Sequence, residues 1–87
     1  MNPAEIRNKK LNFQKANHCV RRLFKQGFDV TAIDLHGGRP KIEIAFQPKC
    51  RRLGGVWYRR SSNGAGSIYR MAALISGCQV EWDEAAN

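Results

Sequence analysis

The spacing of apolar residues changes near residue 27, and this change constrains the fold more than any other feature of the sequence. Between residues 3 and 26 apolar side chains recur at three- and four-residue spacing, whereas from residue 29 onward they alternate in short runs. The first spacing is typical of an amphipathic helix, and alternation is typical of half-buried strands. The sequence therefore predicts one long helix followed by a sheet.

Capping signals set the ends of the predicted helix at about residues 3–26. Asn2 can cap its start, Pro3 suits the first helical position, and Glu5 can complete a capping box. Gly27 is a natural residue just past a helix end, where the backbone turns left-handed. The apolar stripe expected to face the core consists of Ile6, Phe13, Ala16, Val20, Leu23 and Phe24.

The remainder of the chain predicts strands joined by glycine-rich turns. The expected strands cover residues 29–35, 40–46, 56–60, 68–75 and 78–82. Residues 68–75 also fit a buried helix, because so short an apolar run has no decisive period, but the glycine-rich flanks favour a strand. Residues 47–55 are expected to form a basic loop. The predicted fold is α+β, with one N-terminal helix packed on a four- to five-stranded antiparallel sheet.

Length and charge bound the architecture and the kind of partner. Eighty-seven residues form one domain, 1–87, with too little chain for a second core. The net charge is +8, and fourteen of the fifteen basic residues fall within residues 1–25 and 39–60. Clustered positive charge attracts nucleic acid or acidic proteins without distinguishing between them. An apolar sheet face wider than one helix would invite a second subunit, so we expect a homo-oligomer.

The cysteines and the apolar runs indicate a cytoplasmic protein. Cys19, Cys50 and Cys78 lie far apart in the sequence and form neither a disulfide framework nor a zinc motif. We therefore expect three buried thiols, no metal and a reducing compartment. No apolar run approaches the length of a membrane span, and the N-terminus lacks the apolar core of a signal peptide.

Candidate catalytic groups are few. The chain has only His18 and His36, and a general base needs a reacting group held beside it. Asp34 and His36 share a strand face and could pair, but we interpret them as a solvated carboxylate and the start of a turn. The sequence predicts no catalytic residue, no cofactor and no enzymatic activity.

Arginine pairs beside aromatic residues are the strongest binding signal. Arginine next to an aromatic ring suits phosphate contact and base stacking. Strict alternation would place Trp57 with Arg59 on one face of the strand and Tyr58 with Arg60 on the other. The candidate partner- or nucleic-acid-binding residues are Arg21, Arg22, Lys25, Arg39, Arg51, Arg52, Trp57, Arg59 and Arg60.

Several short features resemble small early and regulatory proteins of temperate phages and prophages of enteric bacteria. These are the lone N-terminal helix, the R-P-x-I-E-I run of residues 39–44, Cys50, a polar glycine hairpin, and the closing G-C-x-V-x-W of residues 77–82. The resemblance covers residues 16–84, and its motifs are structural. Members of this class include antirepressors, which bind a phage repressor and release it from its operators.

The leading expectation is therefore a non-enzymatic phage or prophage regulator of the antirepressor type that acts by protein–protein contact in the bacterial cytoplasm. A small basic nucleic-acid-binding protein is the first alternative, because the same arginines could contact phosphate. A phage inhibitor of a bacterial defence system, similar to an anti-CRISPR protein, is the second. Inhibitors that imitate DNA are acidic, so this basic chain would have to bind a protein surface or act allosterically.

Overall fold

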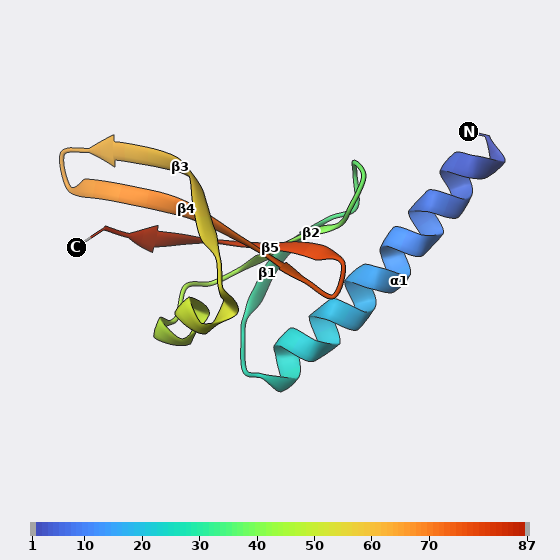
Figure 1. The fold of residues 1–87 in the computed structure, drawn as a ribbon, viewed down its shortest axis with the longest axis horizontal. Coiled ribbons are helices and arrows are strands. Elements are labelled where there is room, and N and C mark those ends of the chain that lie inside the picture. Colours follow the sequence, from blue (N-terminus) through green and yellow to red (C-terminus); the bar gives the residue numbers. More distant parts are fainter. Residues whose placement is uncertain (1, 87) are drawn as a thin grey trace.

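A long helix followed by a five-stranded sheet makes up the computed structural model, which describes residues 2–86 (Figure 1). The elements in chain order are α1 (Pro3–Lys25), β1 (Val30–Asp34), β2 (Lys41–Ile44), the 3-10 helix η1 (Pro48–Leu53), β3 (Val56–Asn63), β4 (Gly66–Ile75) and β5 (Cys78–Ala85). The α+β class predicted from the sequence is confirmed. No helix within residues 2–86 combines the length and the apolarity that crossing a membrane requires.

Both ends of α1 are held by the predicted caps. The Asn2 side chain accepts a hydrogen bond of 2.8 Å from the backbone N–H of Glu5, three residues into the helix. At the other end Gly27 has a φ of +81°, and the Phe28 N–H donates to the Leu23 carbonyl at 3.0 Å. This pairing reverses the chain and places Phe28 back against the core. The helix ends at Lys25, one residue before the predicted end.

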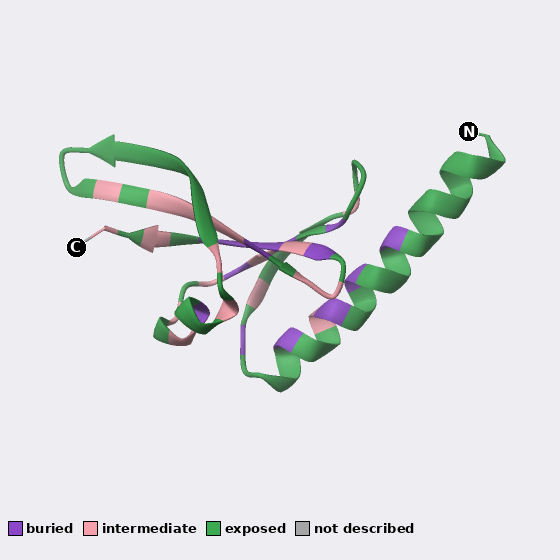
Figure 2. Cartoon of the chain, viewed as in Figure 1, coloured by how far each residue is buried: buried purple, intermediate pink, exposed green. Residues whose placement is uncertain are grey.

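Only part of the predicted apolar stripe of α1 is buried. Ala16 and Leu23 are buried, but Ile6, Phe13 and Phe24 are exposed. The buried positions on α1 are Asn12, Ala16, Cys19 and Leu23. Figure 2 shows that the first turns of α1 extend beyond the sheet, and residues 3–11 are all exposed, so Ile6 has no opposing sheet. Phe24 is exposed for a different reason, because its neighbour Leu23 takes the buried side of the last turn. Helical spacing reports neither how far the opposing sheet reaches nor which of two adjacent apolar residues faces it.

The sheet has the order β1-β2-β5-β4-β3, and one of its four pairings is parallel. β2 and β5 run in the same direction with Ile42 opposite Val80, whereas the other three pairs are antiparallel. The all-antiparallel prediction is therefore wrong at this one pair. η1 and the β3–β4 hairpin lie between β2 and β5 in the sequence, and this long connection lets β5 enter the sheet in the direction of β2.

The strand bounds differ from the predicted ranges mainly at the ends. β1 and β2 are shorter than predicted, and Phe46, the last residue of the predicted second strand, lies beyond β2 and is 40% exposed. β3, β4 and β5 are longer, and β5 continues to Ala85, past its predicted end at residue 82. Residues 68–75 form a strand, as favoured. The predicted loop of residues 47–55 contains η1, whose Cys50 is buried.

The core lies between the C-terminal half of α1 and one face of the sheet. Its buried members are Cys19, Leu23, Phe28, Ile42, Ile44, Cys50, Ala73, Cys78, Val80 and Trp82. The helix contacts β1, β2 and β5, and η1 adds Cys50 beside them. The part of this same sheet face formed by β3 and the first half of β4 lies beyond the helix (Figure 1).

Candidate nucleic-acid interface

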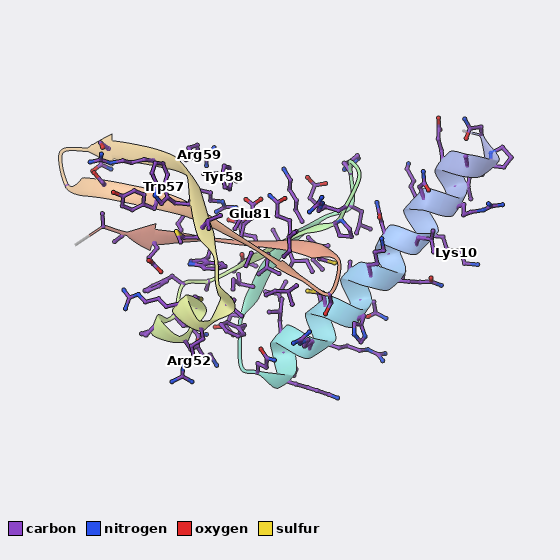
Figure 3. All side chains as sticks on the ribbon, viewed as in Figure 1. Lys10, Arg52, Trp57, Tyr58, Arg59 and Glu81 are labelled. Atoms are coloured by element: carbon purple, nitrogen blue, oxygen red, sulfur yellow. The ribbon has the colours of Figure 1, made fainter. Side chains whose placement is uncertain are left out.

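A bulge in β3 decides which side chains share the uncovered part of the sheet. Trp57 pairs with Met71 and Arg59 pairs with Arg70, so Tyr58 is the extra residue between them. Tyr58 and Arg59 consequently point to the same face, away from α1, and Trp57 points to the face that carries the core (Figure 3). The alternation predicted for this strand is therefore wrong. The bulge brings Arg60, instead of Arg59, to the side of Trp57.

The resulting cluster consists of Trp57, Arg60 and Tyr69, and we call it the aromatic platform. The Trp57 and Tyr69 ring centroids are 5.3 Å apart with planes tilted by 58°. The Arg60 guanidinium carbon lies 5.8 Å from the Tyr69 ring centroid, and its Nη2 donates to Ser67 Oγ at 3.2 Å. Trp57 is 58% exposed. A tryptophan this open beside an anchored cation resembles the stacking surface of single-strand binders.

Arg51 of η1 lies next to this platform. Its guanidinium carbon is 5.6 Å from the Phe46 ring centroid, and its Nε is 3.8 Å from Glu84 Oε1. Glu84 pairs with Tyr69 across β4 and β5, which places Arg51 at the edge of the platform. The separation between Arg51 and Glu84 is too long for a hydrogen bond, and Glu84 Oε1 is buried with no hydrogen-bond partner among residues 2–86.

A second basic surface lies where α1 ends. Arg22, Lys49 and Arg52 line a groove of about 540 Å³ between the end of α1, η1 and the turn from β4 to β5. We call it the basic groove. Consecutive residues of a 3-10 helix point about 120° apart, so Arg51 faces the platform and Arg52 faces the groove. η1 therefore lies between the two basic surfaces.

The opposite face of the sheet gathers carboxylates around one arginine. Arg70 contacts Glu81 at 3.0 Å and both Glu43 and Asp83 at 3.1 Å, and Tyr58 donates to Glu81 at 2.6 Å. Burial by itself would raise the pKa of Glu81, but the hydrogen bonds that it accepts outweigh burial and lower that pKa below the usual 4.5. Three of the seven carboxylates thus gather around a single arginine on the face away from the platform, and this arginine offsets their charge only in part.

The structure separates the nine predicted binding residues. It brings Arg51, Trp57 and Arg60 together at the platform and Arg22 with Arg52 in the basic groove. The other four lie apart: Arg59 is on the opposite face, Arg39 is in the turn before β2, and Arg21 and Lys25 are exposed on α1 outside the groove.

The nine candidate binding residues omit three residues that belong to these surfaces. Lys49 lines the basic groove, Phe46 lies against Arg51, and Tyr69 forms half of the aromatic pair. The sequence contained only weak local signals for two of them. Lys49 lies two residues before the Arg51–Arg52 pair, and Tyr69 alternates with Met71 in a predicted strand. Their placement depends on strand pairing and on η1, which no local pattern indicated.

The thiols and the histidine pair add no reactive group to these surfaces. Burial raises the pKa of the Cys19 thiol to about 12, and the neighbouring Cys78 adds to the shift. His36 Nδ1 does lie 3.0 Å from Asp34, but Asp34 also accepts from the His36 backbone N–H at 2.8 Å, and the exposed pair closes a turn. In the described part of the chain no three His, Cys, Asp or Glu residues are placed to hold a metal ion.

Comparisons with known proteins give no further guide. No known protein family, curated protein or solved structure matches this chain. The functional argument therefore depends on the geometry of the platform and the basic groove.

Proposed function

We propose that this protein is a non-enzymatic binding protein that holds single-stranded nucleic acid on the aromatic platform. The observation that carries the proposal is the open Trp57 ring, paired with Tyr69 at 5.3 Å, with Arg60 over Tyr69 and Arg51 near Glu84, the strand partner of Tyr69. Bases stack on such rings whatever their sequence, and arginines beside the rings contact the phosphates. We therefore favour nucleic-acid binding over antirepressor-type contact.

The distribution of charge supports the same partner. Glu43, Glu81 and Asp83 surround Arg70 on the opposite face, so their negative charge lies away from the platform and is partly offset there. The net charge of +8 is therefore carried largely by exposed lysines and arginines. A polyanion that reaches the platform meets Arg60 of β3 and Arg51 of η1, and it also meets the carboxylate of Glu84 beside Arg51 at the platform edge.

Fluorescence anisotropy with a labelled single-stranded oligothymidylate tests the proposal. We expect binding that weakens steeply with salt, and Trp57→Ala should weaken it about five- to hundredfold because one base loses its stacking partner. Phe24→Ala is the matched control, since Phe24 is an exposed aromatic residue on α1, 78% exposed and remote from the platform. Absence of binding by the wild-type protein at low salt would overturn the proposal, as would equal affinities of Trp57→Ala and Phe24→Ala.

The neighbouring arginines of β3 provide a second control. Arg60 lies over Tyr69, whereas the β-bulge turns Arg59 to the opposite face. Arg60→Ala should weaken oligonucleotide binding several-fold and lower its salt dependence, and Arg59→Ala should leave both unchanged. The two variants lose the same charge at adjacent positions, so a general effect of net charge would weaken both equally and would contradict a site on the platform.

A separate apolar surface favours a second candidate function, contact with a regulatory protein of the antirepressor kind. Phe13, Val20, Ile33 and Leu35 line a groove of about 310 Å³ between α1 and β1, and Phe13 is 61% exposed. β1 is an edge strand, so its outer side can pair with an added strand. Lys9 and Arg21 lie one helical turn from the lining residues Phe13 and Asn17 on α1, and this spacing suits an acidic segment with apolar anchors on the partner.

Loss of a repressor–operator band on adding the protein tests this second candidate. Phe13→Asp should abolish the release of operator DNA, whereas Phe24→Asp and Trp57→Ala should retain it. If the protein instead retards the bare operator, or if Phe13→Asp is as active as the wild type, antirepressor-type contact through this groove is wrong. A change of subunit mass in Phe13→Asp would show that a second copy of the chain occupies the groove.

A further inference from the structure

The basic groove is a separate concave surface with cations on opposite walls. Arg22 comes from α1, whereas Lys49 and Arg52 come from η1, and Phe28, Leu53 and Ile75 supply apolar lining. Among residues 2–86 no carboxylate belongs to this lining. Three positive groups around a hollow without an acid create a local potential that attracts an anion.

Two of the three cations are held in place. Arg22 Nη1 donates to Ser76 Oγ at 3.1 Å, which ties the end of α1 to the turn between β4 and β5. Lys49 Nζ donates to the Gln26 carbonyl at 2.6 Å and lies 4.8 Å from the Phe28 ring centroid. The lysine thereby offsets the partial negative charge at the end of the helix, which would otherwise disfavour an anion. Fixed cations lose little side-chain freedom when a ligand binds.

Arg52 joins this groove to the platform. It follows Arg51 directly in η1, and Arg51 lies beside Phe46 and Glu84 at the platform edge. A chain of stacked bases that leaves Trp57 in this direction therefore passes Arg51 first and Arg52 next. Regularly spaced phosphates match consecutive cations along such a path, and bases have their stacking partners at the platform.

We infer that the basic groove is a phosphate subsite that continues the aromatic platform, so that a bound single strand runs from Trp57 across η1 to Arg22. The inference rests on the proposed function. It adds to that function the path of the bound nucleic acid across the protein and the residues that hold its far end. The ligand chemistry is a phosphodiester, and a free phosphate group is the alternative source of the same contacts.

The salt dependence of binding tests the subsite with a matched pair of double variants. Arg22→Ala/Arg52→Ala removes two cations from the groove, and Arg21→Ala/Lys25→Ala removes two exposed cations of α1 that do not line it. Loss of two phosphate contacts should lower the slope of log affinity against log salt by about 1.4 for a single strand. The control should keep nearly the wild-type slope. Thermal unfolding checks that both variants remain folded, and Arg22→Gln/Arg52→Gln provides a second groove variant.

Oligonucleotide length separates the subsite from the platform. A strand just long enough to cover Trp57 and Tyr69 should bind the groove variant and the wild type equally, and longer strands should lose their added affinity only in the groove variant. Equal slopes for the groove variant and the control would overturn the subsite while Trp57→Ala still reports on the platform. If no oligonucleotide binds the wild type, the proposed function and this inference both fail.

Inorganic phosphate distinguishes the two ligand sources. Calorimetric titration of the wild type with phosphate should show no saturable binding in the millimolar range, because an isolated phosphate lacks the stacked bases that bring it to the groove. Saturable phosphate binding that disappears in Arg22→Ala/Arg52→Ala, together with an unchanged oligonucleotide slope, would identify a small-anion site and overturn the inference.

Discussion

Glu84 illustrates how a single residue can oppose the binding surface around it. Its carboxylate is 3.8 Å from Arg51 on the platform side, and its Oε1 is buried without a hydrogen-bond partner in residues 2–86. The carboxylate repels phosphate and competes with it for Arg51. A buried acceptor without a hydrogen bond also costs free energy, so the residue stabilises neither binding nor the fold strongly.

Replacing Glu84 by Gln should therefore strengthen nucleic-acid binding. We expect Glu84→Gln to raise the affinity for a single strand several-fold at low salt, because Arg51 becomes free to contact phosphate. Anisotropy titration measures the change, and Asp83→Asn is the control because Asp83 contacts Arg70 on the opposite face. Unchanged or weaker binding by Glu84→Gln would show that Arg51 does not contact the strand.

Glu81 shows the effect of a buried charged network on stability. The folded protein lowers its pKa below 4.5, so the folded state binds fewer protons than the unfolded state in acid. Its stabilisation is complete above pH 4.5 and is lost as the pH falls through the lower folded value. Chemical unfolding between pH 7 and pH 3 should show this loss. Glu81→Gln should cost about 2 kcal/mol at pH 7 and flatten the acid slope, and an unaltered slope would contradict the assignment.

At the scale of elements, η1 matters because it packs Cys50 into the core and presents Arg51 and Arg52 on different sides. The sequence pattern of residues 47–55 predicted a loop, since a single 3-10 turn has too few residues for a period. Gly55 then joins η1 to β3 at a tight contact. A Cβ at this position would lie 2.6 Å from the buried Trp82 ring and 3.2 Å from the Ala72 carbonyl oxygen.

Gly55→Ala should accordingly destabilise the protein. Trp82 is buried and rigid, so the ring or the η1–β3 junction must move, at a cost of about 1–3 kcal/mol. Gly38→Ala is the control, because a Cβ there meets no atom of the described residues 2–86 within 4 Å. Denaturant unfolding compares the two, and equal midpoints would show that the junction adapts freely.

At the scale of the whole molecule, the chain is extended for its size. Its radius of gyration is 14.4 Å, and its dimensions are 48 × 27 × 19 Å. A compact domain of this length has a radius of about 12 Å. The excess comes from the first half of α1 and from the β3–β4 hairpin, which project from the core in different directions (Figure 1). Both projections carry exposed apolar side chains, including Ile6, Phe13, Val56 and Trp57.

The expected homo-oligomer stays a prediction that follows from this shape. Uncovered apolar surface and two edge strands favour self-association, so the mass measured by light scattering should exceed that of one chain and should fall on dilution. Phe13→Asp changes the projecting part of α1, and Val56→Asp changes the β3–β4 hairpin. The variant whose measured mass falls to that of one chain identifies the projection that forms the interface. The mass of a single chain at all concentrations would contradict the prediction.

The sequence alone determined the features that depend on residues near one another in the chain. The helix ends follow from Asn2 and Gly27, and the order of one helix and five strands follows from a change of period that each segment carries within itself. Helix capping and strand alternation depend on residues only a few positions apart, so both can be recognised in the sequence without knowledge of the tertiary structure.

Only the tertiary structure decided the parallel pairing of β2 with β5, the reach of the sheet under α1, and the β-bulge at Tyr58 that exchanges the faces of Arg59 and Arg60. Each of these depends on contacts between segments distant in the sequence, where one extra residue in a strand reverses every later side chain. The basic composition was therefore readable from the sequence, whereas the tertiary contacts placed Trp57, Arg60 and Arg51 on one surface and the Arg70 network on the other.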